Sequence, residues 1–271
     1  MTSPKRVLIT GATGHVGSST YLVLAAQPEK YDVYALDRQR KLSARVPARN
    51  QNLDIPEERF HLCDLADAGT VRQAVEGMEV VVHLGADPGD DGSWESLLSN
   101  NVVGTYNVFE ACRDAGVSRL VVASSIMVSQ GHQEQEPYKA IHDKRFSDVP
   151  EKYPKITPEI PAQPRGIYGA TKVWTESLAK VYAHTHGMSC ICIRIGQVER
   201  DRPRPPNGHD IFVSQRDIVQ IIERAVNAGE EIQFGIFYGV SNNDWRWMEI
   251  EDAREKLGYV PQDRAEDNHV Y

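Results

Sequence analysis

Two kinds of segment alternate along the 271-residue chain. Short runs of aliphatic and β-branched residues, typical of strands buried on both faces of a parallel sheet, are separated by longer segments with helical periodicity. The predicted strands are Arg6–Thr10, Asp32–Leu36, Arg59–Leu62, Val80–Leu84, Leu120–Ala123, Cys190–Ile195 and Ile232–Phe237. The predicted helices are Ser18–Ala26, Ala68–Glu76, Trp94–Ala115, Tyr168–His186 and Gln215–Ala228, with a short helix and loop in Asp252–Asp263. This alternation predicts an α/β fold in which helices cover both faces of a parallel sheet.

The segment His132–Arg165 interrupts the alternation. It contains six prolines and many charged residues, and it shows no clear period. Connections between the elements of a compact domain are usually far shorter. We therefore expect this segment to be either a lid over a functional site or a disordered excursion.

The composition is that of an ordinary globular protein, with 41% hydrophobic and 25% charged residues. The formal net charge of −8 argues against a broad surface for nucleic acid or for an anionic membrane. No apolar run approaches the roughly 20 residues that a membrane span needs, and no signal-peptide pattern is present. The four cysteines form no CxxC pair, and no cluster has metal-site spacing. We expect a cytoplasmic protein that binds no metal.

A glycine-rich turn follows the first predicted strand, in the GxxGxxG stretch Gly11–Gly17. Glycines at such a turn let the backbone approach a pyrophosphate, and the free N–H groups at the start of the next helix attract it. The spacing differs from the common GxGxxG fingerprint, and a tight turn without a ligand is the alternative. We expect the turn to bind a dinucleotide. The contacting residues would be Gly11, Thr13, Gly14, His15, Val16 and Gly17.

Acidic residues follow the next two strands. Asp37 lies 20 residues beyond Gly17, where a carboxylate can accept hydrogen bonds from the adenosine ribose. That carboxylate would repel a 2′-phosphate and so favours NAD over NADP, although the neighbouring Arg38 could hold a phosphate. A solvated strand end is the alternative for Asp37. Asp64, followed by Leu65, either meets the adenine edge or caps the next helix.

A tyrosine and a lysine stand four residues apart where a long helix is predicted to begin. The pair is Tyr168 and Lys172, and this spacing puts both side chains on one face of the helix. A nearby ammonium stabilises a phenolate and lowers the pKa of the phenol. The tyrosine could then act as an acid or a base near neutral pH. A surface helix without a catalytic role is the alternative.

These motifs together resemble the extended short-chain dehydrogenase/reductase superfamily, the group that also contains NAD-dependent epimerases and dehydratases. The matching pieces are Gly11–Gly17, Asp37, Asp64-Leu65, His83–Ala86, Asn101–Asn107, Ser124-Ser125 and the pair Tyr168 and Lys172, in the order of the family. The resemblance implies a Rossmann-type doubly wound sheet of order 3-2-1-4-5-6-7. It also implies that Ser125, or less favourably Ser124, contacts the reacting group and that Tyr168 transfers the proton. Lys172 would also hold the nicotinamide ribose. Leu84, Gly85, Ala86, Asn101 and Ile195 would line the cofactor channel.

Within that superfamily, the chain is most similar to the uronate dehydrogenases. The similar stretches include His83-Leu84-Gly85 and Ile193–Gly196. The resemblance implies that Arg194 pairs with a sugar carboxylate, whereas a structural contact near Asp201 is the alternative. Ile126 and Met127 replace an Asn-His pair that contacts the sugar in uronate dehydrogenases, and a substrate serine is replaced near Asp87. With Ser125 and Arg194, these three residues are the expected substrate-binding residues. We therefore expect the chemistry to be retained and the substrate to differ.

One domain is expected over residues 1–271. Its cofactor-binding core would span about 1–190, with a small C-terminal substrate lobe at about 197–216 and 238–271 and the lid-like insertion at 132–165. The predicted function is NAD-dependent oxidation of a sugar or sugar-acid hydroxyl, with C1 as the favoured position. The alternatives are a sugar or nucleotide-sugar epimerase and a non-catalytic NAD(P)-binding regulator. The resemblance further implies a homodimer, formed through the helices Trp94–Ala115 and Tyr168–His186.

Overall fold

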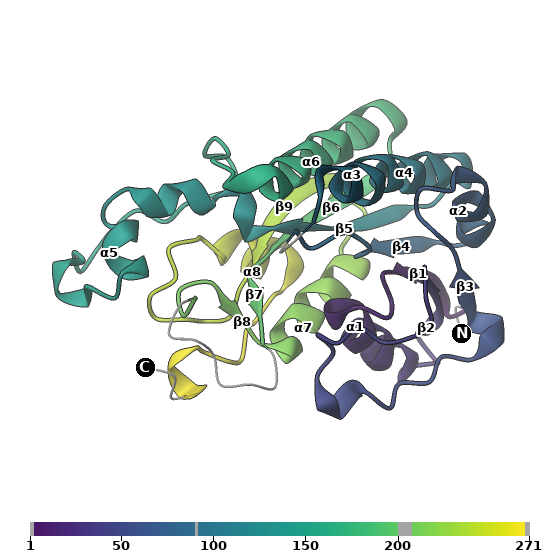
Figure 1. Ribbon diagram of the computed structural model, residues 1–271, viewed down its shortest axis with the longest axis horizontal. Helices are drawn as coiled ribbons and strands as arrows, with labels where there is room; N and C mark the ends of the chain where they lie inside the picture. Colours follow the sequence, from purple (N-terminus) through teal and green to yellow (C-terminus); the bar gives the residue numbers. More distant parts are fainter. Residues whose placement is uncertain (1–2, 90–91, 200–207, 269–271) are drawn as a thin grey trace.

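The core of the protein is a seven-stranded parallel sheet of order β3-β2-β1-β4-β5-β6-β9 (Figure 1). The computed structural model describes residues 3–89, 92–199 and 208–268. The strands are β1 (Lys5–Thr10), β2 (Tyr31–Asp37), β3 (Phe60–Leu62), β4 (Val80–His83), β5 (Arg119–Ser125), β6 (Ser189–Ile195) and β9 (Phe234–Gly239). This is the predicted order, since β9 is the seventh predicted strand, and the Rossmann-type α/β fold is confirmed. β9 begins two residues later than expected. The short strands β7 (Gln197–Val198) and β8 (Phe212–Val213) form a separate parallel pair.

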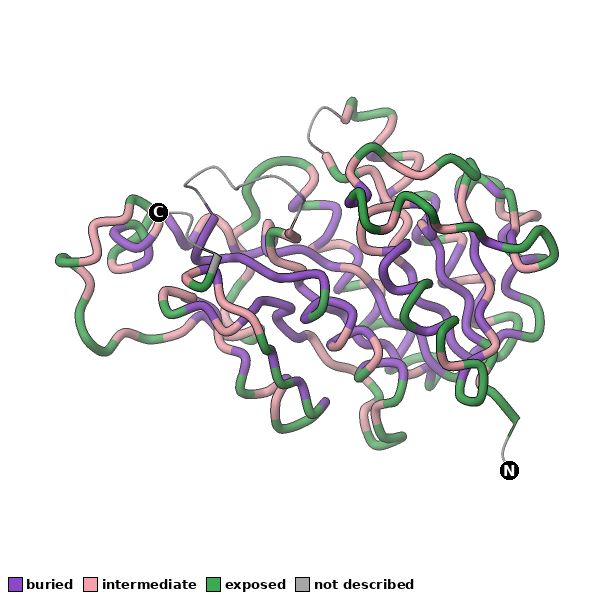
Figure 2. The backbone as a smooth tube through the Cα atoms, turned by 90° about the horizontal axis from the view of Figure 1, so that it is seen from below, coloured by how far each residue is buried: buried purple, intermediate pink, exposed green. Residues whose placement is uncertain are grey.

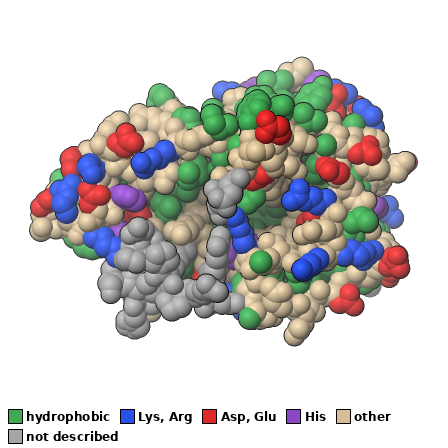
Figure 3. All heavy atoms as spheres, in the orientation of Figure 1, with side chains coloured by type: hydrophobic (Ala, Val, Ile, Leu, Met, Phe, Trp, Pro, Cys, Tyr) green, Lys and Arg blue, Asp and Glu red, His purple; other side chains and the backbone are tan. Residues whose placement is uncertain are grey.

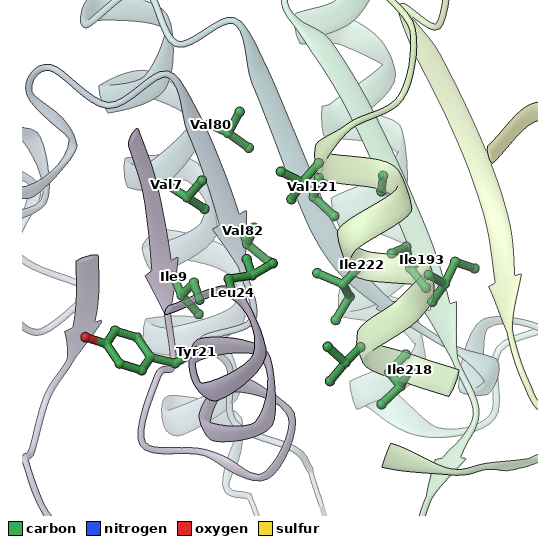
Figure 4. Close-up of a cluster of buried hydrophobic side chains, with 14 of the residues drawn as sticks. Val7, Ile9, Tyr21, Leu24, Val80, Val82, Val121, Ile193, Ile218 and Ile222 are labelled. Carbon is green, nitrogen blue, oxygen red and sulfur yellow. The ribbon is translucent and has the colours of Figure 1, made fainter. Parts of the chain in front are cut away.

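Helices cover both faces of the sheet, as predicted. One face carries α1 (His15–Ala25) and α7 (Gln215–Val226), and the other carries α2 (Ala68–Val75), α4 (Thr105–Asp114) and α6 (Gly166–His186) (Figure 1). Because side chains alternate along a strand, neighbouring residues enter opposite cores. Val7 and Ile9 point toward Leu24 of α1 and toward α7 (Figure 4). Leu8, between them, packs in the second core with Phe109 of α4. Figure 2 shows this buried backbone running through the middle of the molecule.

The predicted helix Trp94–Ala115 is divided into three parts. α3 (Trp94–Leu97) leads into a π-helical segment, η3 (Leu98–Gly104), and α4 follows. A π-helical segment widens the turn and rotates the residues after it relative to those before it. The sequence predicted a single helix because the three helical parts follow one another without a break.

The segment 132–165 packs against residues near the C-terminus. It contains α5 (Tyr138–His142), which lies at the end of the molecule away from the sheet (Figure 1). A third hydrophobic cluster joins Tyr138 to Trp247, and Phe146 stacks on Trp245 with ring centroids 4.3 Å apart. A parallel β-bridge pairs Ile156 with Met248. In place of the disordered excursion that the sequence left open, the structure gives this segment apolar partners near the C-terminus.

Two further sequence expectations concern the surface and the cysteines. Within the described residues, no helix is long and apolar enough to cross a membrane. All four cysteines are buried as free thiols. Cys190 and Cys192 lie in the same cluster, because residues two apart on a strand point to the same face of the sheet. They contribute apolar packing.

Candidate active site

A cleft of about 790 Å³ lies where the carboxyl ends of β1, β2, β4, β5 and β6 meet. Crevices at this edge are the usual ligand sites of open parallel sheets. The predicted residues that line it are Gly11, Thr13, Gly14, His15, Val16, Gly17, Asp37, Arg38, Asp64, Leu65, Leu84, Gly85, Ala86, Asp87, Ser125, Tyr168, Lys172 and Ile195. Within the described part of the chain, the residues that line this cleft include none from 132–165.

The glycine turn brings backbone very close to backbone. Gly11 has a φ of +70°, and a Cβ there would lie 2.7 Å from the Cα of Gly85. A Cβ on Gly17 would collide with the carbonyl of Gly11. The first turn of α1 has Gly14 as its N-cap with no side-chain cap, and it contains no acidic residue. Its N–H groups and positive dipole end are therefore suited to an anionic group such as a pyrophosphate.

The two carboxylates predicted at strand ends have different local roles. Asp37 is half-buried and accepts hydrogen bonds from the backbone N–H of Thr13 at 3.1 Å and of Arg38 at 2.8 Å. These bonds hold the carboxylate beside the glycine turn. Asp64 accepts from the N–H of Ala66 at 2.9 Å. It does not cap α2, because Asp67 is the N-cap of that helix.

A buried histidine holds the cleft floor together. His83 Nδ1 lies 2.8 Å from the hydroxyl of Thr10, and its Nε2 lies 3.1 Å from that of Thr105. The Thr10 hydroxyl also accepts the N–H of Gly85 at 3.1 Å. Burial, with a smaller effect of the Lys172 charge, lowers the pKa of His83 to about 3. A neutral imidazole suits this chain because one ring nitrogen donates and the other accepts.

Tyr168 and Lys172 face the cleft from the first turns of α6. The Nζ atom of Lys172 lies 5.7 Å from the centroid of the Tyr168 ring and donates to the carbonyl of Ala123 at 2.9 Å. Complete burial lowers the pKa of Lys172 to about 8. The hydrogen bond to Ala123 holds the Lys172 amine on the side of α6 where the Tyr168 ring lies. The arrangement can stabilise a phenolate at Tyr168.

The two serines at the end of β5 have different partners. Ser124 donates to Glu176 Oε1 at 2.6 Å inside the protein. Ser125 accepts the N–H of Met127 at 3.2 Å and so caps the short helical turn η4 (Ile126–Val128). Both serines touch the cleft, but only Ser125 has a hydroxyl that is not bonded to a carboxylate. The geometry therefore favours Ser125 as the serine that faces a substrate, while it also makes the capping bond.

Arg194 is engaged by the protein itself. Its guanidinium binds both carboxylate oxygens of Glu176, at 2.8 and 2.9 Å, and is 2.9 Å from the hydroxyl of Tyr238. The side chain is buried and lines a second cavity, which is formed by residues of α6 and β9, rather than the cleft. This position differs from the expected contact with a sugar carboxylate. The alternative partner, Asp201, lies outside the described residues.

Three other predicted residues also lie away from the cleft surface. Ile126 is buried in the third hydrophobic cluster, because the chain turns toward the C-terminal lobe directly after Ser125. Met127 packs its carbonyl against Gly169 and accepts the N–H of Arg165 at 3.2 Å. Asn101 is 1% exposed and binds the backbone of the loop after β4. Among the described residues, these three support the cleft and do not line it.

The structure adds residues that sequence reasoning missed. Glu176 follows Tyr168 and Lys172 at the same spacing of four. This spacing puts a third polar residue on the same buried stripe of the helix, and it was a signal by which the sequence could have revealed Glu176. The cleft is also lined by residues without such a signal: Leu36, Gln39, Ser43, Arg45, Cys63, Pro88, Asn100, Ala123, Gly196, Gln197 and Val198. Over the described ranges, no group of His, Cys, Asp and Glu residues could hold a metal ion.

Comparison with known proteins adds independent information. Residues 7–270 match the model of the NAD dependent epimerase/dehydratase family. The chain is 31% identical to an NAD-dependent glucose-6-phosphate dehydrogenase of Haloferax volcanii, over 96% of this chain and 94% of that protein. It is 29% identical to an L-arabinose 1-dehydrogenase (NAD(P)(+)) of the same organism, over 96% and 97%. A uronate dehydrogenase mutant of Agrobacterium tumefaciens, solved in complex with NAD, superposes with a TM-score of 0.75 at 29% identity, over 97% of this chain and 86% of that one.

Proposed function

Since the chain belongs to the NAD-dependent epimerase/dehydratase family, we propose that it is an NAD-dependent dehydrogenase acting on a hydroxyl group of a free sugar or sugar acid. The C1 hydroxyl is the favoured position, because the arabinose enzyme among its relatives is a 1-dehydrogenase. One observation carries the proposal. The glycine turn and Asp37 line the same cleft as Ser125, Tyr168 and Lys172.

The residues of the cleft fit NAD. The close contact of Gly11 with Gly85 leaves a backbone cradle that a Cβ would fill, and the uncapped start of α1 suits the pyrophosphate. Asp37 can accept from the adenosine ribose hydroxyls and opposes a 2′-phosphate. When bound, NAD supplies the hydride acceptor for the oxidation.

The remaining chemistry is proton transfer by the chain. Ser125 donates a hydrogen bond to the substrate oxygen and orients it toward Tyr168. The phenolate of Tyr168 takes the hydroxyl proton as the C–H bond breaks. Lys172, held by the carbonyl of Ala123, stabilises that phenolate with its positive charge. A C1 oxidation of an aldose would yield a lactone.

The test is NADH formation at 340 nm over a panel of free sugars, sugar phosphates, uronic acids and nucleotide sugars, with NADP in parallel. We expect turnover with NAD and at least one free sugar or sugar acid. Conversion of a nucleotide sugar to its epimer without net NADH would instead establish an epimerase. Tight NAD binding without turnover of any compound would indicate a non-catalytic NAD-binding protein.

Replacement of the proposed base gives a sharper test. Tyr168→Phe retains the ring and removes only the hydroxyl that accepts the proton. We expect kcat to fall by at least about 100-fold, the contribution of a positioned acid or base, with the NAD dissociation constant unchanged within a factor of two. Turnover close to that of the natural enzyme would contradict the mechanism.

A further inference from the structure

The loop after β4 touches the side chain of Tyr168. Gly89, in this loop, has a φ of +78°. A Cβ built there would lie 2.6 Å from Cβ and 2.7 Å from Cγ of Tyr168, closer than real carbon contacts allow. The backbone of the loop therefore lies directly against the base of the tyrosine side chain. Glycine is required at residue 89 by the contact and by the backbone conformation.

Asp87 determines where this glycine lies. Its Oδ1 accepts the N–H of Gly89 at 2.8 Å, and its Oδ2 accepts the hydroxyl of Ser96. Both carboxylate oxygens are thus bound to the protein. The backbone of Asp87 is held as well, since its N–H donates to Asn101 Oδ1 at 2.7 Å and its carbonyl accepts from Asn101 Nδ2 at 3.0 Å. A residue fixed by four hydrogen bonds gives the loop a defined position.

The same asparagine reaches the helix that carries the tyrosine. Asn101 Nδ2 lies 3.3 Å from the hydroxyl of Thr171, which donates to the carbonyl of Tyr168 at 2.7 Å. Tyr168 is consequently connected to the loop by two routes, a direct contact at Gly89 and hydrogen bonds through Asn101. Asn101 belongs to the π-helical segment η3, whose wider turn brings it between the loop and α6.

We infer that Asp87 and Gly89 are positioning residues that hold the phenol of Tyr168 in register with Lys172 and Ser125. This inference rests on the proposed function, because it assumes that Tyr168 is the base. Asp87 acts on the tyrosine through Gly89, and its carboxylate does not bind the substrate. Its expected role as a substrate-binding residue is replaced by this one.

The first test compares two glycine variants. Gly89→Ala adds a methyl group against Tyr168, whereas Gly116→Ala adds one at a φ of +69° with nothing within 4 Å. Both variants carry the same kind of backbone strain, so their difference isolates the contact. We expect Gly89→Ala to lower kcat at least tenfold and to move the low-pH limb of kcat/KM to higher pH, because a displaced phenol loses the stabilisation of its phenolate by Lys172. NAD affinity should stay within twofold. Gly116→Ala should retain the natural kcat and pH profile.

A second pair of variants adds no atoms. Asp87→Ala removes the acceptor for the Gly89 N–H, whereas Asp87→Asn retains a carbonyl oxygen that can accept it. We expect Asp87→Ala to reproduce the shifted pH profile and Asp87→Asn to restore most of the lost kcat, with KM for the sugar little changed in both.

The outcomes separate this inference from the proposed function. If Tyr168→Phe abolishes turnover while Gly89→Ala and Asp87→Ala keep the natural kcat and pH profile, the positioning role is refuted and the function stands. A large rise in KM without a pH shift in Asp87→Ala would assign the carboxylate to substrate binding and also refute the inference. Normal turnover in Tyr168→Phe would refute the function itself.

Discussion

His83 shows how burial decides the chemistry of a single side chain. Its imidazole is enclosed between Thr10 and Thr105 at the floor of the cleft. A charged imidazole would lose its hydration there, and both nitrogens would have to donate. The pKa of about 3 follows from this burial. Because the folded protein keeps His83 neutral, it cannot serve as an acid or base near pH 7, and its role is to hold Gly85 in place through Thr10.

The pH dependence of stability follows from the same residue. The unfolded chain binds a proton at His83 below its ordinary pKa of 6.5, whereas the folded protein does not until about 3. The stability that the protein gains from a neutral His83 is therefore present above pH 6.5. It is lost as the pH falls toward 3, by about 1.4 kcal/mol for each pH unit. We expect His83→Asn to show a shallower loss of stability between pH 6.5 and 4.5 in urea titrations. Parallel curves for the two proteins would contradict the assignment.

Arg194 illustrates what a residue type leaves undecided. A planar guanidinium suits any carboxylate, whether it belongs to a sugar or to the protein. The resemblance to uronate dehydrogenases favoured a sugar carboxylate as the partner. In the structure, the two carboxylate oxygens of Glu176 accept hydrogen bonds from the Arg194 guanidinium at 2.8 and 2.9 Å. Which carboxylate pairs with Arg194 depends on which face of α6 packs against β6. The sequence of neither element specifies that face.

At the scale of elements, α6 carries the proposed catalytic pair and a structural ion-pair residue on one face. Tyr168, Lys172 and Glu176 recur every four residues and so share a face that runs along the helix. The first two line the cleft, and Glu176 joins the helix to Arg194 of β6 and to Ser124 of β5. One helix face therefore fixes the tyrosine relative to the strand ends that carry the rest of the site.

The buried ion pair of α6 and β6 gives a prediction about stability. Glu176→Gln leaves the Arg194 charge buried without its carboxylate, which typically costs about 3–5 kcal/mol. The double variant Glu176→Leu with Arg194→Met replaces the pair by apolar side chains and should recover most of that loss. Chemical denaturation of the two variants and the natural protein measures both effects. A single variant as stable as the natural protein would show that the pair is not needed.

At the scale of the whole molecule, exposed hydrophobic residues gather over one surface. Figure 3 shows hydrophobic side chains over α3, α4 and α6. The exposed hydrophobic residues of these elements and of η3 are Trp94, Leu98, Val103, Tyr106, Ile167 and Val181. Contiguous apolar surface of this kind marks interaction sites in soluble proteins. It lies on the two predicted helices that we expect to form a homodimer.

A charge in this surface tests the dimer. We expect the natural protein to have twice the mass of one chain in light scattering at micromolar concentration. Tyr106→Glu, at a side chain that is 46% exposed, should produce the monomer, because burying an unpaired carboxylate in the interface is costly. Val260→Glu, on another surface and 62% exposed, is the control and should stay dimeric. A natural protein that is monomeric would refute the expectation.

The strand order of the sheet followed from the family resemblance. The residues by themselves determined the alternation of strands and helices, the glycine turn and the Tyr168–Lys172 pair. These features are local: strand periodicity, turn chemistry and a spacing of four residues act within a few residues of the chain. Only the tertiary structure decided the partner of Arg194, the burial of Ile126, the role of Asp87 and the place of the segment 132–165. Each depends on which surfaces meet after folding, since a side chain of given chemistry takes the partner that packing brings within reach.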